Sequence, residues 1–174
     1  MQISAIVARF DSLKKNNYTL DVKLGWVNHV DGDVWDNVCK HAATVALAKS
    51  DGAYNLPAGV TFGHLLKVFL DGEEIFKANS PATTGYHSDP SGKIIVYPDA
   101  TGAVEISHKV PFTPHAAATE QAFIPAPYDK VYDDYLSAMV DKYNREFDLY
   151  NSSMKFYNAS FDEYAAWYKD QKED

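Results

Sequence analysis

Two segments near the start of the chain alternate between apolar and polar positions. Residues 2–10 set branched and aromatic side chains among smaller or polar ones, and residues 18–26 alternate strictly from Tyr18 to Trp26. A period of two is typical of a half-buried strand, because successive side chains of a strand point to opposite faces. Residues 14–17, Lys-Lys-Asn-Asn, form a turn signal between the two segments. The pattern therefore predicts an N-terminal β-hairpin.

The period changes at Val34. From there to Ala46, apolar residues recur three and four positions apart, which is the spacing of one face of a helix. Asp33 can accept hydrogen bonds from the N–H groups of the first turn, and Gly52 can end the helix. The pattern predicts one helix near residues 34–49.

Turn signals are frequent between residues 56 and 127. A short apolar segment after Thr61 fits both a helical turn and a strand, and Asp71-Gly72 is a tight-turn pair, so we expect a short helix followed by a hairpin. Beyond it we expect a loop at 80–92, a strand at 93–97, a turn at 98–102, a strand at 103–110 and an irregular, proline-flanked connection at 111–127.

Residues 128–174 differ from the rest of the chain. They contain 8 of the 12 Tyr and neither Pro nor Gly. Their large apolar side chains recur every three or four positions, close to a heptad repeat, with one four-residue stutter between Tyr143 and Phe147. This spacing predicts helical structure for the C-terminal region.

A capping-box pattern subdivides this region. Ser160 and Glu163 have the spacing of that motif, which predicts a helix break near Asn158. We therefore expect one long helix at 128–156 and a shorter one at 161–170, with a single continuous helix as the alternative.

The elements together predict an α+β fold. Five or six strands, mostly antiparallel and arranged as hairpins, occupy the first 110 residues, with the helix near 34–49 among them. We expect an α+β domain at 1–127 and a C-terminal pair of acidic, aromatic helices at 128–174. Those helices either pack on the domain or face a partner.

Composition and charge narrow the classes of function. The 174 residues carry 16 basic and 24 acidic side chains, a net charge of −8, and the pI is about 5.1. Nucleic-acid and anionic membrane surfaces are poor partners for such a chain, whereas a basic protein surface is a good one. Cys39 is the only cysteine, and no signal peptide or membrane-spanning apolar segment is evident, so we expect a cytoplasmic protein.

Candidate chemistry is sparse. Asp31 and Asp33 flank Gly32 after an expected strand, a spacing at which two carboxylates can converge on a divalent cation, with His29, Cys39 and His41 as softer ligands nearby. The alternative is a turn and helix cap without metal. The chain has no phosphate-binding glycine loop, dinucleotide fingerprint or paired Cys-x-x-Cys, so we predict no cofactor and favour a non-enzymatic protein.

The C-terminal region is the predicted partner-binding surface. Tyr and Trp supply large contact areas at interfaces, and acidic side chains between them would direct the surface toward a basic partner. The residues concerned are Tyr132, Asp133, Asp134, Tyr135, Asp141, Tyr143, Asp148, Tyr150, Tyr157, Tyr164 and Trp167.

Three functions fit the sequence. The first is a protein-interaction module, such as a small inhibitor or assembly factor, for which a viral protein is one example. The second is a metal-dependent enzyme using the Asp-x-Asp loop, and the third is a structural homo-oligomer. The alternative for the surface itself is that it packs on the protein's own sheet.

Overall fold

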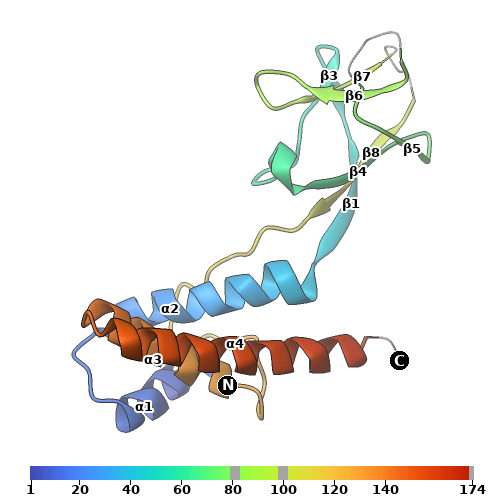
Figure 1. The fold of residues 1–174 in the computed structure, drawn as a ribbon. Helices are drawn as coiled ribbons and strands as arrows, with labels where there is room; N and C mark the ends of the chain where they lie inside the picture. The colour runs from blue at the N-terminus through green and yellow to red at the C-terminus, as the bar shows by residue number, and fades with distance from the viewer. Residues whose placement is uncertain (79–82, 98–101, 173–174) are drawn as a thin grey trace. The chain divides into compact units, whose positions relative to one another are not determined.

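A computed structural model describes residues 1–78, 83–97 and 102–172 of the chain. It divides into two compact units. The helical unit comprises Met1–Cys39 and Phe112–Asp174, and the β unit comprises Lys40–Pro111 (Figure 1). With four α-helices and two antiparallel sheets among the described residues, the predicted α+β class and helical C-terminal region are confirmed. Residue 127, the domain boundary expected from the sequence, lies inside the helical unit.

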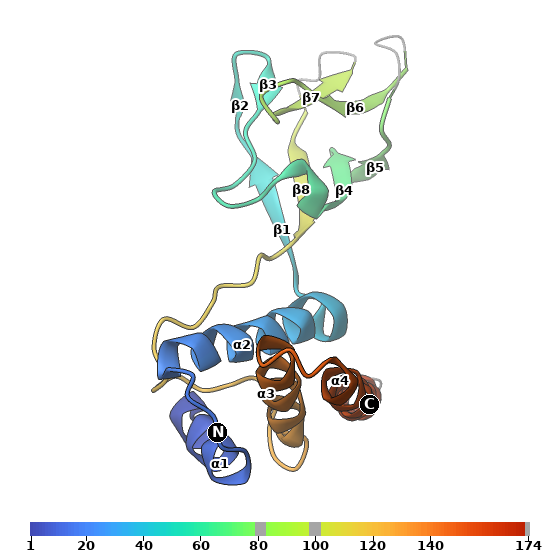
Figure 2. The same ribbon diagram turned by 60° about the vertical axis from the view of Figure 1, so that its left-hand side comes forward.

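The helical unit has two layers. One layer is α2 (Leu20–Asp33), which continues into a π-helical segment, η1 (Val34–Cys39). The other contains α1 (Ile3–Leu13), α3 (Lys130–Tyr143) and α4 (Phe147–Asp170), with α3 in the middle (Figure 2). The core between the layers is built from fully buried side chains, among them Ile3, Phe10, Val27, Val30, Val34, Tyr132 and Leu136.

The predicted N-terminal hairpin is wrong, because both of its segments are helices. In α1 the buried residues are Ile3, Ile6, Val7 and Phe10, which fall on one helical face at spacings of three and four. In α2 the alternating apolar residues are not all buried, since Val22 is exposed. The buried side chains of α2 again follow helical spacing and are Lys23, Trp26, Val27, Val30 and Asp31.

The predicted helix at 34–49 is wrong in its second half. The chain is helical only to Cys39, and Lys40 takes a left-handed backbone conformation with φ of 48° that ends the segment. Strand β1 (Ala42–Leu47) follows and pairs with β8 (Val104–Lys109). Along β1, exposed and half-buried side chains alternate, because one face lies on the core of the β unit.

The described residues of the β unit form two four-stranded antiparallel sheets. Their strand orders are β1-β8-β4-β5 and β2-β3-β7-β6. The remaining strands are β2 (Lys49–Ser50), β3 (Ala53–Tyr54), β4 (Leu65–Leu70), β5 (Glu73–Ile75), β6 (Gly85–Ser88) and β7 (Ile94–Tyr97). The hydrophobic core of this unit is formed by Tyr54, Val68, Ile75, Ile94, Val96, Val104 and Ile106.

Most of the predictions for the middle of the chain are confirmed. A short 3₁₀-helix, η2 (Phe62–His64), precedes the β4–β5 hairpin, whose turn is Asp71-Gly72. Strands β7 and β8 lie where strands were expected, and the connection at 111–127 is irregular. Strand β6 was missed inside the expected loop at 80–92, and of the expected turn at 98–102 only Gly102 is described.

The C-terminal helices break at a different place from the one predicted. The break lies at Asn144–Glu146, where Arg145 has φ of 65°, and α4 runs through Asn158 without interruption. The predicted break near Asn158 and the single continuous helix are therefore both wrong. Ser160 does not cap a helix, since its hydroxyl donates to Asp134 at 2.6 Å. The break coincides with the stutter in the apolar repeat.

No helix among the described residues is long and apolar enough to cross a membrane.

Candidate protein-interaction surface

Basic side chains of the helical unit form ion pairs with the acidic residues of α3 and its N-terminus. Arg9 of α1 contacts Asp129 at 2.5 Å and Asp133 at 2.9 Å, and Lys14, just after α1, is paired with Asp141. The Lys14 ammonium also donates to the carbonyl oxygen of Ser137 at 3.2 Å. These contacts form an ionic seam along the interface between α1 and α3.

Two serines of α4 donate hydrogen bonds to carboxylates of α3. Ser153 donates to Asp141 at 2.8 Å, and Ser160 donates to Asp134, which also lies 3.5 Å from the ammonium of Lys130. Three of the acids expected on the partner-binding surface, Asp133, Asp134 and Asp141, are thus largely enclosed between α1 and α4 and carry partners within this unit. Of the four acids in that set, Asp148 is the one that is exposed.

Most of the expected surface aromatics also face the core. Tyr132, Tyr135, Tyr157 and Tyr164 are buried, Tyr150 and Trp167 are half-buried, and Tyr143 is exposed. Burial disfavours the phenolate, so it raises the pKa of Tyr135 to about 12 and the pKa values of Tyr132, Tyr157 and Tyr164 above the usual value. The C-terminal repeat therefore packs mainly on the other helices of its own unit.

Asp31 and Asp33, the expected metal ligands, bind different groups of the protein. Asp31 is fully buried; it accepts hydrogen bonds from the Tyr132 hydroxyl and from the N–H of Phe123 at 3.3 Å, and it contacts Nε2 of His115 at 2.8 Å. Burial raises the pKa of Asp31. The Asp33 carboxylate accepts from the Tyr157 hydroxyl at 3.3 Å. Within the described ranges, no three His, Cys, Asp or Glu side chains are grouped to hold a metal ion.

The groups around Asp31 form a buried polar network that the sequence did not reveal. Nδ1 of His115 contacts Glu120 at 3.2 Å, and the Tyr132 hydroxyl accepts from the N–H of Ile124 at 2.9 Å. The network ties the irregular connection at 112–127 to α2 and α3. Asp31 and Tyr132 are completely enclosed in the core, so the hydrogen bond between them is shielded from water.

One end of the helical unit exposes large apolar side chains. The α1–α2 connection and the α3–α4 turn lie together at this end (Figure 1), where the Tyr18 hydroxyl donates to Asn144 at 3.0 Å. Six side chains there are between 41% and 70% exposed. We call this set the apolar end, and its members are Leu13, Leu20, Val22, Tyr143, Phe147 and Leu149.

An aromatic cluster supports the apolar end from beneath. The ring of Tyr143 stacks on Trp26 with centroids 5.8 Å apart and lies 6.0 Å from Tyr18, which meets Trp26 edge to face at 5.2 Å. Trp26 is buried, so the exposed ring of Tyr143 rests on a fixed base. A side chain held in this way loses little conformational entropy when it is covered by a partner.

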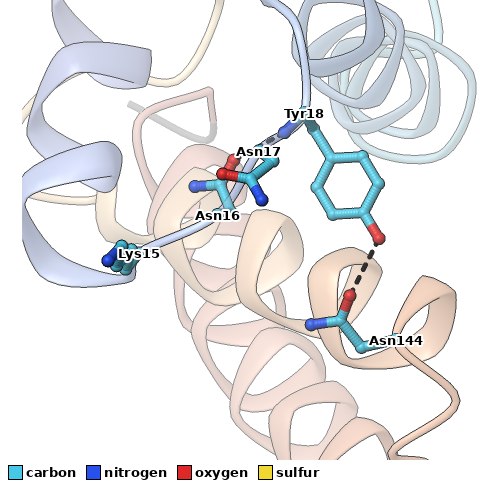
Figure 3. Close-up of a pocket in the computed structure, with 5 residues that line it drawn as sticks. All are labelled: Lys15, Asn16, Asn17, Tyr18 and Asn144. Atoms are coloured by element: carbon cyan, nitrogen blue, oxygen red, sulfur yellow. Dashed lines mark hydrogen bonds between the residues drawn. The ribbon is translucent and has the colours of Figure 1, made fainter.

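Two open hollows flank the α3–α4 turn. The first, of about 470 Å³, is lined by Lys15, Asn16, Asn17, Tyr18 and Asn144 (Figure 3). The second, of about 560 Å³, is lined by Arg145, Glu146, Phe147, Asp148 and Leu149. The lining of the first hollow has one positive charge and that of the second has a net charge of −1.

The charges near the apolar end are balanced, although the helical unit as a whole is acidic. The unit holds 17 acidic and 10 basic residues, and so carries −7 of the chain's −8. Around the apolar end the exposed cations are Lys15, Lys142 and Arg145, and the exposed anions are Asp11, Asp21, Glu146 and Asp148. Asp11 is paired with the buried ammonium of Lys23 at 2.6 Å, which balances its charge. The apolar end is therefore surrounded by charges that balance, although the unit as a whole is acidic.

Comparison with known proteins identifies no relative: no family model matches the chain, and no curated protein matches it in sequence.

Proposed function

We propose that this protein is a non-enzymatic protein-interaction module that binds a protein partner through the apolar end of its helical unit. The observation that carries the proposal is the gathering of six exposed large apolar side chains at one end of the unit. Side chains of this size, about half exposed, leave on the order of 500 Å² of apolar surface in water. A patch of this size equals the largest apolar patch of a typical monomer, and such patches are often functional.

The anatomy of the apolar end supports an interface. Aromatic residues are enriched in the centres of interfaces, and a polar rim surrounds them. Here Tyr143 and Phe147 lie beside the turn, with asparagine and charged side chains around them. An assembly factor or an inhibitor would use such a surface.

The carboxylates that could attract a basic partner are not the ones expected from the sequence. Asp133, Asp134 and Asp141 already have partners inside the unit. A basic partner surface would instead meet exposed carboxylates of α4, which are Asp148, Asp162 and Glu163. The acidic excess would then speed association, while the apolar end would supply most of the affinity.

Capture from the lysate of the native host tests the proposal. Immobilised wild-type protein is compared with the variant Phe147→Ser/Leu149→Ser and with Phe76→Ser, which removes an equally exposed phenylalanine of the β unit. We expect a protein, either another chain or this one, to be retained by the wild type and by Phe76→Ser and to be lost from the double variant. The same capture by all three proteins would refute the proposal.

A further inference from the structure

We infer that the partner of the apolar end is a second copy of this chain, bound about a two-fold axis with the α3–α4 turn of each copy in the Lys15–Tyr18 hollow of the other. The inference rests on the proposed function and names a second, equally acidic copy as the partner in place of one with a basic surface. In a two-fold contact the same surface is used by both copies, so it must be complementary to itself. The charges, the hollows and the area of the apolar end meet this requirement.

Net charge opposes association of two copies at most places on the helical unit. Each chain carries −8, and the helical unit carries nearly all of it. Two acidic surfaces repel unless the contact is locally neutral. The apolar end is such a place, because Asp11 is paired with Lys23 and the other exposed charges around it are three cations and three anions. A partner selected by basic charge would bind more strongly to the acidic faces elsewhere on the unit.

The two hollows differ in a way that suits a two-fold contact. The hollow at Lys15 is lined by one cation and three asparagines, and the turn beside the other hollow presents Glu146 and Asp148. A two-fold axis places the turn of the first copy against the Lys15 hollow of the second, and the reverse. Glu146 of each copy then lies near Lys15 of the other, while Phe147 and Leu149 become covered.

The exposed area is sufficient for a reversible dimer. Two apolar ends together would remove on the order of 1,000 Å² of surface from water, which is near the lower limit for a specific interface. The asparagines and charged residues of the rim add to this area. We therefore expect a dimer that forms at micromolar concentrations and dissociates on dilution.

Sedimentation equilibrium of the full chain over 5–500 µM, in 0.15 M and 0.5 M NaCl, tests the inference. We expect the wild type to be a concentration-dependent dimer that persists at the higher salt, because apolar burial is not weakened by screening. Phe147→Ser/Leu149→Ser should be a monomer throughout, and Phe76→Ser should match the wild type. A monomeric wild type at 500 µM, or dimerisation of the double variant equal to that of the wild type, would overturn the inference.

A charge exchange tests the register of the two copies. Lys15→Glu and Glu146→Lys should each weaken the dimer about tenfold, because each places like charges in contact twice. The combined variant Lys15→Glu/Glu146→Lys should recover most of the loss. If it does not recover, the proposed opposition of Lys15 and Glu146 is wrong. Circular dichroism and thermal unfolding of each variant verify that the fold is retained, as expected for exposed positions.

The outcome separates this inference from the proposed function. A monomeric wild type whose lysate partner is still lost in Phe147→Ser/Leu149→Ser would reject the second copy and keep the interaction surface. A monomeric wild type with unchanged capture by the variant would reject both.

Discussion

Removing the hydroxyl of Tyr132 tests the buried network in the helical unit. In the wild type this hydroxyl donates to the carboxylate of Asp31 and accepts from the N–H of Ile124, and neither partner is accessible to solvent. Tyr132→Phe keeps the ring and deletes both hydrogen bonds. Asp31 retains His115 and the N–H of Phe123, whereas the N–H of Ile124 loses its partner.

The magnitude follows from these two losses. A hydrogen bond to a charged group contributes about 1.5–3 kcal/mol, and a buried donor left without a partner costs about 1–3 kcal/mol. Because the groups share one site and can rearrange in part, we expect Tyr132→Phe to lower the free energy of unfolding by about 2–4 kcal/mol. That is a large part of the 5–15 kcal/mol that is usual for a domain.

Urea unfolding followed by circular dichroism measures the change, with Tyr135→Phe as a matched control. Tyr135 is a buried tyrosine of the same helix, and among the contacts described for this unit its hydroxyl has no hydrogen bond. The control should change the free energy of unfolding by less than about 0.5 kcal/mol. A loss of less than 0.5 kcal/mol in Tyr132→Phe would show that the network contributes little to stability and refute the reasoning.

Three further predictions concern other parts of the chain. Arg9→Ala should destabilise the helical unit by about 2–3 kcal/mol in urea unfolding, because Asp129 and Asp133 would stay largely buried without their cation. Arg9→Lys should recover part of the loss. Equal stability of the wild type and both variants would contradict this prediction. Alkaline pH should also destabilise the unit. Folding raises the pKa values of Tyr132, Tyr135, Tyr157 and Tyr164 above the unfolded-state pKa of about 10. The neutral phenols therefore stabilise the folded state fully below about pH 10. Above it, the free energy of unfolding falls by about 1.4 kcal/mol per pH unit for each such Tyr, until the pH passes that residue's folded-state pKa. Absorbance at 295 nm during the titration should show these four ionising only on unfolding, and normal titration of all 12 Tyr in the folded protein would disprove it. Gly85→Ala should lower the stability of the β unit by about 2 kcal/mol or more, because a Cβ there would lie 2.4 Å from the carbonyl oxygen of Phe76. Gly63→Ala is the control, since the nearest atom to its Cβ would be 3.7 Å away. Similar melting temperatures for the two variants would count against the packing argument.

Local signals predicted the middle and the end of the chain well. The Asp71-Gly72 turn, strands β7 and β8 and the helical C-terminal region follow from short-range patterns that the structure keeps. A tight turn or a helical repeat is fixed by residues close in sequence, so these elements are readable without tertiary information. The α3–α4 break was not predicted: it coincides with the stutter between Tyr143 and Phe147, whereas the capping-box pattern at Ser160 had led to a predicted break near Asn158.

The N-terminal segments were misassigned for a physical reason. Residues 18–26 alternate strictly, yet α2 buries only the stripe that faces the other helices and leaves Val22 in solvent. The surface on which a segment packs decides its secondary structure when its sequence fits two periods. That surface, formed by α1, α3 and α4, includes residues more than 100 positions away.

The surface predicted from the sequence and the proposed apolar end share part of the chain but few side chains. The aromatic and acidic character of residues 128–174 indicated helices that make contacts, and of the predicted surface residues Tyr143 lies at the apolar end and Asp148 beside it. The sequence could not show that Arg9 and Lys14 neutralise Asp133 and Asp141, because these pairs join residues about 125 positions apart. Leu13, Leu20 and Val22 became part of the site for the same reason.

By itself, the sequence determined the α+β class, the local turns and the helical, aromatic character of the C-terminal region, because each depends on neighbours along the chain. Tertiary structure decided which of these residues remain exposed. Packing covers most tyrosines of the heptad-like repeat, α1 supplies the cations for the acids of α3, and the meeting of two distant turns leaves the apolar end in solvent. Burial and charge pairing depend on contacts between distant segments, and so does the surface that the protein offers to a partner.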